Sequence, residues 1–202
     1  MTTGDLAIAR HVVDEYIKAF GSVFFGTGVA VATVAAEVFG RKKMFLTAGT
    51  NSMKVYKEYV KAPSKNELNI FGGRYVERYD GLFGKEILKS IEEFFPNIII
   101  FDADGLNRDG FMCHGEEEVV IRKSLLTKPT DVRIILADWD TIGRKAAHKF
   151  GNICDVNAHS GQAGKTIIVT AQPPEDTFEA EEFYNEVAAI KALKSGIKID
   201  VI

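Results

Sequence analysis

Two hydrophobic periods alternate along the chain. Short apolar runs bounded by glycine and polar residues are typical of buried strands, and apolar positions every three or four residues are typical of helices. The apolar runs predict strands at residues 22–25, 43–47, 67–71, 97–101, 132–137, 152–156, 166–170 and 198–202. The helical pattern covers residues 29–39, 52–61, 85–95, 116–126, 141–150 and 178–194. This order predicts an α/β fold in which helices cover both faces of a mainly parallel sheet.

The beginning and the end of the chain fit one domain. Residues 1–20 predict an N-terminal amphipathic helix rather than a signal peptide, since charged residues interrupt the apolar positions. The apolar run 23–38 contains two glycines and is too short to cross a bilayer. We therefore expect a single cytoplasmic domain over residues 1–202, with a loop at 157–165 and a C-terminal helix and strand at 172–202.

Composition narrows the function classes only slightly. The 202 residues are 46% hydrophobic and 26% charged, which are ordinary values for a globular protein. A formal charge of −3 gives no general reason to expect nucleic-acid binding. Cys113 and Cys154 are far apart and have no zinc-type spacing, so neither a disulfide framework nor a metal site is expected. No cofactor is expected either.

A glycine turn follows the first predicted strand. Gly26, Thr27 and Gly28 stand between this strand and a helix, where glycines allow a ligand to approach the backbone and the helix N-terminus favours an anion. The motif lacks the GK[ST] of a phosphate-binding P-loop, and Val31 replaces the third glycine of GxGxxG. An ordinary strand-to-helix turn is the alternative.

The next two strands also end in polar or glycine residues. Asn51 and Ser52 follow the second strand, where they can line a pocket or simply cap the next helix. Gly72, Gly73 and Arg74 follow the third strand. Two glycines permit close approach and an arginine can grip a phosphate with two hydrogen bonds. The alternative is a tight turn with a solvated arginine.

Residues 97–118 carry the strongest chemical signal. An apolar strand ends in Asp102 and Asp104, and a polar loop then brings His114 and Glu118 to the start of a helix. Carboxylates beside a histidine suit proton transfer in sugar chemistry. Acidic residues in a first helical turn also stabilise the helix itself, and a loop histidine can be a plain surface residue.

All these groups fall after successive strands. Asp138 adds another carboxylate after the strand at 132–137, in a place where it can equally cap a helix. Because the carboxyl ends of parallel strands meet at one edge of a sheet, we expect the groups to surround one crevice.

Seven stretches together resemble the C-terminal effector-binding domain of DeoR-family sugar-catabolism repressors. That domain is similar in fold to ribose-5-phosphate isomerase, glucosamine-6-phosphate deaminase and the CoA transferases. The matching stretches are Phe24-Phe25-Gly26-Thr27-Gly28, Thr50-Asn51-Ser52, Phe71-Gly72-Gly73, Leu82-Phe83-Gly84, Ala103-Asp104-Gly105, Glu117-Glu118 with Arg122-Lys123, and Leu136-Ala137-Asp138 with Gly143-Arg144.

The resemblance implies a Rossmann-like three-layer αβα sandwich that binds a phosphorylated sugar or a related metabolite. It implies a homo-oligomeric sensor linked to the transcription of carbohydrate genes. The phosphate side of the pocket would be Gly26, Thr27 and Gly28. The rest of the expected pocket is Asn51, Ser52, Gly72, Gly73, Arg74, Asp104, Gly105, Glu118 and Asp138.

Three features depart from the family pattern. We expect no helix-turn-helix in this chain, because there is no room for one before residue 20, so a separate partner would contact DNA. Asp140 and Thr141 stand where family members usually have a lysine, and Asp102 stands where they commonly have glycine.

Two other functions compete with a sensor. In a phosphosugar isomerase or deaminase, Asp104 or Glu118 would move a proton between carbons, and Asp102 or His114 would assist ring opening. In an interaction module, the helix at residues 11–20 would pack on a second copy. The isomerases that this fold resembles also use a lysine and a glycine-rich segment after the aspartates. The equivalent residues 108–117 contain only Gly110 and Gly115, which favours a sensor over an enzyme.

Overall fold

The computed structural model describes the chain except for residues 1–2, 42–43, 63–64, 157–163, 176 and 194. Its centre is a seven-stranded sheet in which every neighbouring pair is parallel, with the strand order β12-β11-β9-β6-β1-β2-β3. The strands are β1 (Ser22–Phe25), β2 (Thr47–Thr50), β3 (Glu67–Ile70), β6 (Ile98–Asp102), β9 (Val132–Leu136), β11 (Lys165–Thr170) and β12 (Lys198–Val201).

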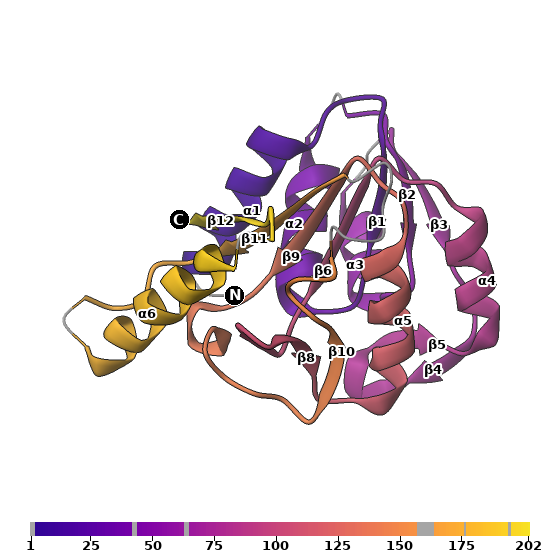
Figure 1. The fold of residues 1–202 in the computed structure, drawn as a ribbon. Coiled ribbons are helices and arrows are strands. Elements are labelled where there is room, and N and C mark those ends of the chain that lie inside the picture. Colours follow the sequence, from indigo (N-terminus) through magenta and orange to yellow (C-terminus); the bar gives the residue numbers. More distant parts are fainter. Residues whose placement is uncertain (1–2, 42–43, 63–64, 157–163, 176, 194) are drawn as a thin grey trace.

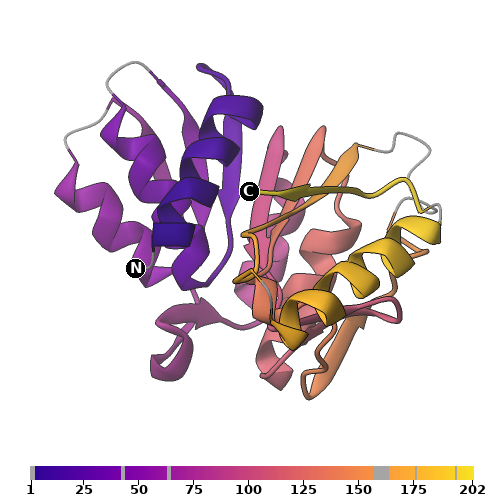
Figure 2. The same cartoon turned by 90° about the vertical axis from the view of Figure 1, so that its left-hand side faces the viewer.

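Helices cover both faces of this sheet (Figures 1 and 2). One face packs on α1 (Thr3–Tyr16), α2 (Val29–Gly40) and α3 (Met53–Lys61). The other packs on α4 (Lys85–Glu93), α5 (Glu116–Thr127) and α6 (Phe178–Ala192). The molecule is therefore the predicted Rossmann-like α/β sandwich. No helix in the described part of the chain has the length and apolar character needed to span a bilayer.

Alternation along the central strands builds the two cores. In β1, Phe24 belongs to the core under α4, α5 and α6, whereas its neighbours Val23 and Phe25 belong to the core under α1, α2 and α3. Successive side chains of a strand point to opposite faces, so continuous apolar runs are required in a sheet that is covered on both sides.

Two small antiparallel sheets are built from segments that follow the carboxyl ends of β3, β6 and β9. An antiparallel hairpin joins β4 (Arg74–Val76) to β5 (Gly81–Phe83), with a 3-10 turn at Glu77–Tyr79 between them. A second antiparallel sheet contains β7 (Gly105–Asn107), β8 (Gly110–Cys113) and β10 (His148–Gly151).

Three predicted elements are wrong. The second strand is Thr47–Thr50 rather than 43–47, because its backbone pairs with β1 on one side and with β3 on the other. The helix expected at 141–150 is a 3-10 turn at Trp139–Thr141 followed later by β10. Residues 152–156 form a turn, and most of the predicted loop 157–165 lies outside the described residues.

A polar cluster fastens the edge strand β12 to α1. The Asp200 carboxylate accepts hydrogen bonds from Tyr16 and, at 2.9 and 3.0 Å, interacts with Lys198 Nζ and His11 Nε2. Burial by itself raises the pKa of Asp200, but these hydrogen bonds outweigh it and lower the pKa below its usual value.

We expect Asp200→Ala to lower the free energy of unfolding by about 2–3 kcal/mol at pH 7, since a hydrogen-bonded charged group is lost from a site where it is 9% exposed. Because the native pKa is lowered, this contribution is present above about pH 4 and is lost below it. Urea denaturation at pH 7 and pH 3 measures both. Asp14→Ala is the control. It removes an ion pair between Arg41 and the 59% exposed Asp14 carboxylate, and it should lower the free energy of unfolding by under about 1 kcal/mol. Equal losses would contradict the prediction.

Candidate functional site

The direction in which successive strands are added to the sheet changes between β1 and β6. The strands β2 and β3 follow on one side of this pair, and β9, β11 and β12 follow on the other. A ligand crevice of an open α/β sheet lies at this switch point, outside the carboxyl ends of the strands. The end of β1 leads through Gly26–Gly28 into α2, and the end of β6 is Asp102, so both expected loops meet here.

Gly28 and Asp102 are in direct contact. A Cβ atom built on Gly28 would lie 2.0 Å from Asp102 Oδ2, which is far inside van der Waals contact. Gly28 also has a φ of 125°, a conformation that residues with a side chain rarely adopt. Gly26 is constrained differently, since a Cβ there would lie 2.9 Å from the Cβ of Phe101. The loop therefore needs both glycines for its packing.

A buried guanidinium joins the carboxylates of the site. Arg122 is 4% exposed and donates to Asp102 Oδ1 at 2.8 Å, Asp104 Oδ2 at 3.1 Å and Glu118 Oε1 at 2.9 Å. Three carboxylates thus share one cation, and with all of them ionised this Arg122 cluster would carry two net negative charges.

Burial decides the protonation of this cluster. Desolvation raises the pKa of Asp102 to about 6 and that of Glu118 to about 7, although Arg122 opposes both shifts. Burial alone would lower the pKa of Arg122, but its three carboxylate neighbours raise it, so the guanidinium stays charged. Protons therefore enter the Arg122 cluster within the range around neutral pH.

His114 takes part in the site through its backbone N–H and not through its side chain. Asp104 Oδ2 accepts a hydrogen bond from the backbone N–H of His114 at 3.0 Å, while the imidazole is exposed. Gly105 is required by packing, because a Cβ there would lie 2.8 Å from the backbone nitrogen of Ala146.

Asn51 and Ser52 are both buried after β2. Ser52 Oγ accepts from the N–H of Val55 at 3.4 Å, so this side chain caps α3. Asn51 Nδ2 donates to the carbonyl of Leu82 at 3.0 Å, whereas its Oδ1 is buried without a hydrogen-bond partner among the described residues. A buried acceptor in that state costs about 1–3 kcal/mol.

Of the two glycines after β3, only Gly73 is required by its contact with the β4–β5 hairpin. A Cβ on Gly73 would lie 2.5 Å from the carbonyl oxygen of Phe83, whereas one on Gly72 would meet open space. Arg74 lies 3.7 Å from Glu117 Oε1, and Arg78 pairs with the same carboxylate. The structure thus gives Arg74 a carboxylate partner within the protein.

Asp138 lines a cavity of about 570 Å³ that adjoins the β1–α2 loop. Desolvation raises the pKa of Asp138, and the nearby carboxylates of Asp5 and Asp140 raise it further. The indole of Trp139 borders the cavity. The remaining lining residues are Asp5, Val29, Ala30, Asp140, Ala171, Gln172, Pro173 and Pro174.

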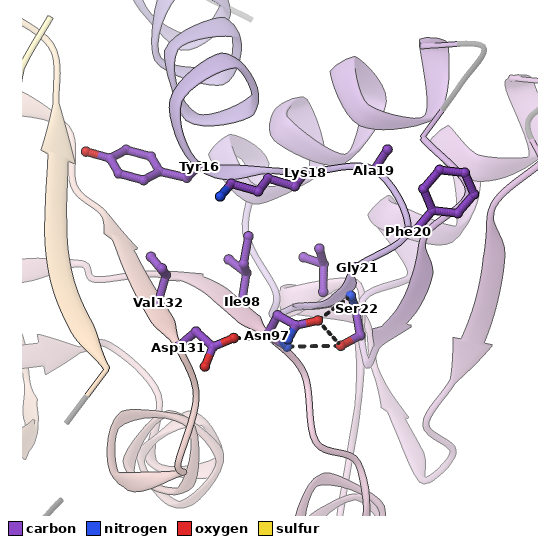
Figure 3. A pocket seen from close by; sticks show the side chains of 11 residues that line it. Tyr16, Lys18, Ala19, Phe20, Gly21, Ser22, Asn97, Ile98, Asp131 and Val132 are labelled. Carbon is purple, nitrogen blue, oxygen red and sulfur yellow. Dashed lines mark hydrogen bonds between the residues drawn. The ribbon is translucent and has the colours of Figure 1, made fainter. Parts of the chain in front are cut away.

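A different pocket, of about 300 Å³, lies at the opposite edge of the sheet (Figure 3). Its apolar floor includes Ile98 and Val132 at the amino ends of β6 and β9, and the segment 18–21 passes across it. Asn97 donates to Asp131 Oδ2 at 3.0 Å on its polar side. This pocket is on the other end of the strands from Gly28 and does not belong to the candidate site.

The sequence pattern did not assign the residue that organises the site. This residue is Arg122, which lies in one of the seven stretches that resemble the family and has no expected role there. Arg122 comes four residues after Glu118 on a predicted helix, and this spacing indicates that the two side chains lie on one helix face. Nothing local shows that Asp102, at the end of β6, and Asp104, just after it, reach the same guanidinium.

The fold and the crevice define an α/β domain that takes a ligand at the switch point of its sheet. The family model of the DeoR C-terminal sensor domain matches residues 4–159, and the chain belongs to this family. Membership supports an effector-binding role of the DeoR type.

The chain is similar to several solved structures, and identity, coverage and TM-score give the extent of the similarity for three of them. Ribose 5-phosphate isomerase A from Methanocaldococcus jannaschii has 14% identity and a TM-score of 0.46 over 68% of this chain and 53% of its own. The enzyme from Plasmodium falciparum has 16% identity and a TM-score of 0.44, over 68% and 52%. A probable sor operon regulator from Shigella flexneri has 12% identity and a TM-score of 0.45, over 90% and 87%.

The chain spans about half the length of the two isomerases. No curated protein matches the chain.

Proposed function

We propose that the effector is a phosphorylated sugar or a related metabolite, bound where the β1–α2 loop meets the cavity beside Asp138. The observation that carries this proposal is the N-terminus of α2 at the switch point. Gly28 precedes the helix and has no side chain to cap it, so the first N–H groups are available to an anion. The adjoining cavity of about 570 Å³ has carboxylates that can accept hydrogen bonds from sugar hydroxyls.

Binding without turnover fits the carboxylates better than catalysis does. Glu118 is 4% exposed and its carboxylate is held by Arg122, so it does not face a substrate carbon. Asp104 is engaged by the same guanidinium and by a backbone N–H. A general base must reach the proton it removes. We propose on this ground that the domain senses its ligand in the control of carbohydrate genes.

Titration calorimetry with a panel of sugar phosphates tests the sensor. We expect binding to the wild-type protein, and we expect Asp138→Ala to weaken it about tenfold or more through the loss of a charged hydrogen-bond acceptor. Inorganic phosphate alone should bind Asp138→Ala no more weakly than it binds the wild type. Asp131→Ala, at the opposite edge, is the matched control and should leave the Kd unchanged. Absence of binding to every member of the panel would refute the proposal.

An isomerase is the second candidate. Burial raises the pKa of Glu118 to about 7, which suits general-base work, but Arg122 would have to release this carboxylate before it could reach a substrate. Isomerisation requires a proton on carbon to exchange with solvent. NMR spectroscopy of ribose 5-phosphate in D₂O would show deuterium incorporation with the wild type and none with Glu118→Gln. If the wild type binds ribose 5-phosphate but incorporates no deuterium, the isomerase is excluded and only the sensor proposal remains.

A further inference from the structure

The carboxylate of Asp102 stands beside the place where the proposed anion would bind. Oδ2, Cγ and Oδ1 would lie 2.0, 2.7 and 3.2 Å from a Cβ on Gly28, so the whole carboxylate faces the residue that precedes α2. A phosphate on the first N–H groups of α2 would be within a few ångströms of this carboxylate, at about the separation where like charges repel strongly.

The surroundings of Asp102 do not cancel its charge. From α5 it faces Arg122, which it shares with Glu118, and from its own loop it faces Asp104. Lys54 of α3 acts on it as a weaker positive charge. One guanidinium for three carboxylates leaves an excess of negative charge next to the anion position.

We infer that Asp102 admits a dianionic phosphate to the Gly26–Gly28 loop only with a proton on its own carboxylate, so that phosphate-bearing ligands bind with the uptake of one proton. This inference rests on the proposed function and concerns the same crevice. It makes Asp102 the residue that selects the charge of the ligand, and it couples sensing to pH.

The proton has a defined place. It comes from solvent and adds to Oδ2, the oxygen nearest Gly28, while Oδ1 keeps its hydrogen bond from Arg122 at 2.8 Å. The new O–H then donates to a phosphate oxygen, so that a repulsive contact becomes a hydrogen bond. Burial already raises the pKa of Asp102 to about 6, which makes this uptake accessible near neutral pH.

Titration calorimetry with inorganic sulfate and with ribose 5-phosphate tests the inference. Sulfate keeps its charge between pH 5.5 and 7.5, so any pH dependence belongs to the protein. The wild-type Kd for sulfate should rise about 20-fold over this range, as expected for one linked proton with a pKa near 6. Titrations in two buffers of different ionisation enthalpy should show uptake of about one proton at pH 7.5.

Asp102→Asn keeps an acceptor for Arg122 and removes the charge. We expect its Kd for sulfate to change several-fold less with pH than that of the wild type, with less proton uptake, and to be lower than that of the wild type at pH 7.5. Titration of Glu118 in the same cluster accounts for any remaining dependence. Asp102→Ser is a second variant in case the amide perturbs the fold. Asp109→Asn removes one exposed charge from the β7–β8 turn and should behave as the wild type.

The outcomes separate the two proposals. If the wild type and Asp102→Asn bind sulfate or ribose 5-phosphate with the same pH dependence and proton uptake, the inference is wrong and the proposed function stands. If neither ligand binds any of these folded proteins at either pH, the proposed function is wrong.

Discussion

Arg122→Met is expected to lower the free energy of unfolding by about 3–5 kcal/mol at pH 8, the range observed when one partner is removed from a buried ion pair. Methionine fills similar space but leaves three carboxylates without their cation. Urea denaturation followed by circular dichroism measures the loss. Arg41→Met, which removes partly exposed pairs to Asp14 and Glu37, is the control and should cost under about 1 kcal/mol.

The loss in Arg122→Met should depend on pH in a stated direction. Because the native pKa values of Asp102 and Glu118 are raised to about 6 and 7, the folded protein holds more protons than the unfolded chain above about pH 4. Their contribution to stability is present below that pH and is lost as the pH rises through 6 and 7. Protonated acids need no counter-charge, so the loss at pH 5.5 should be smaller than at pH 8. An equal loss at both would contradict the role given to Arg122.

Gly28→Ala should lower the free energy of unfolding by at least about 2 kcal/mol, since the φ of 125° is strained for alanine and the new Cβ collides with Asp102. Asp102→Gly in the same protein should recover the part due to the collision. The coupling between the two changes should then exceed about 1 kcal/mol in a double-mutant cycle.

Gly40→Ala is the matched control, because Gly40 ends the same helix and a Cβ there meets no atom within 4 Å. It should change stability by less than about 1 kcal/mol, in the stabilising direction. Gly28→Ala should also abolish sugar-phosphate binding, whereas Gly40→Ala should not. Additive losses for Gly28→Ala and Asp102→Gly would show that the close contact has no energetic consequence.

The parallel α/β fold was predictable because its signals are local. The continuous apolar run at Ile98–Phe101 requires burial on both faces of a strand, and the spacing of Ile87 and Ile91 requires one buried helix face. The resemblance to the DeoR sensor domain, which rested on loop residues after these strands, is confirmed by the family match over residues 4–159.

Elements that depend on distant partners were not predictable. Thr47–Thr50 is a poor strand by composition, and it is a strand because β1 and β3 pair with it on either side. Residues 148–151 pair with β8, more than thirty positions earlier in the chain, and this pairing overrides a local helical pattern.

By itself the sequence determined which loops follow the strands near residues 22–25, 67–71, 97–101 and 132–137. In a parallel sheet these loops share one edge, so chain order is enough to group them. Only the tertiary structure decided that Asp102 lies against Gly28 and that Arg122 joins three carboxylates. These contacts depend on distances of a few ångströms between segments that are far apart in the chain. The charges, protonation and ligand preference of the site follow from those distances, since desolvation and Coulomb energy change steeply over that range.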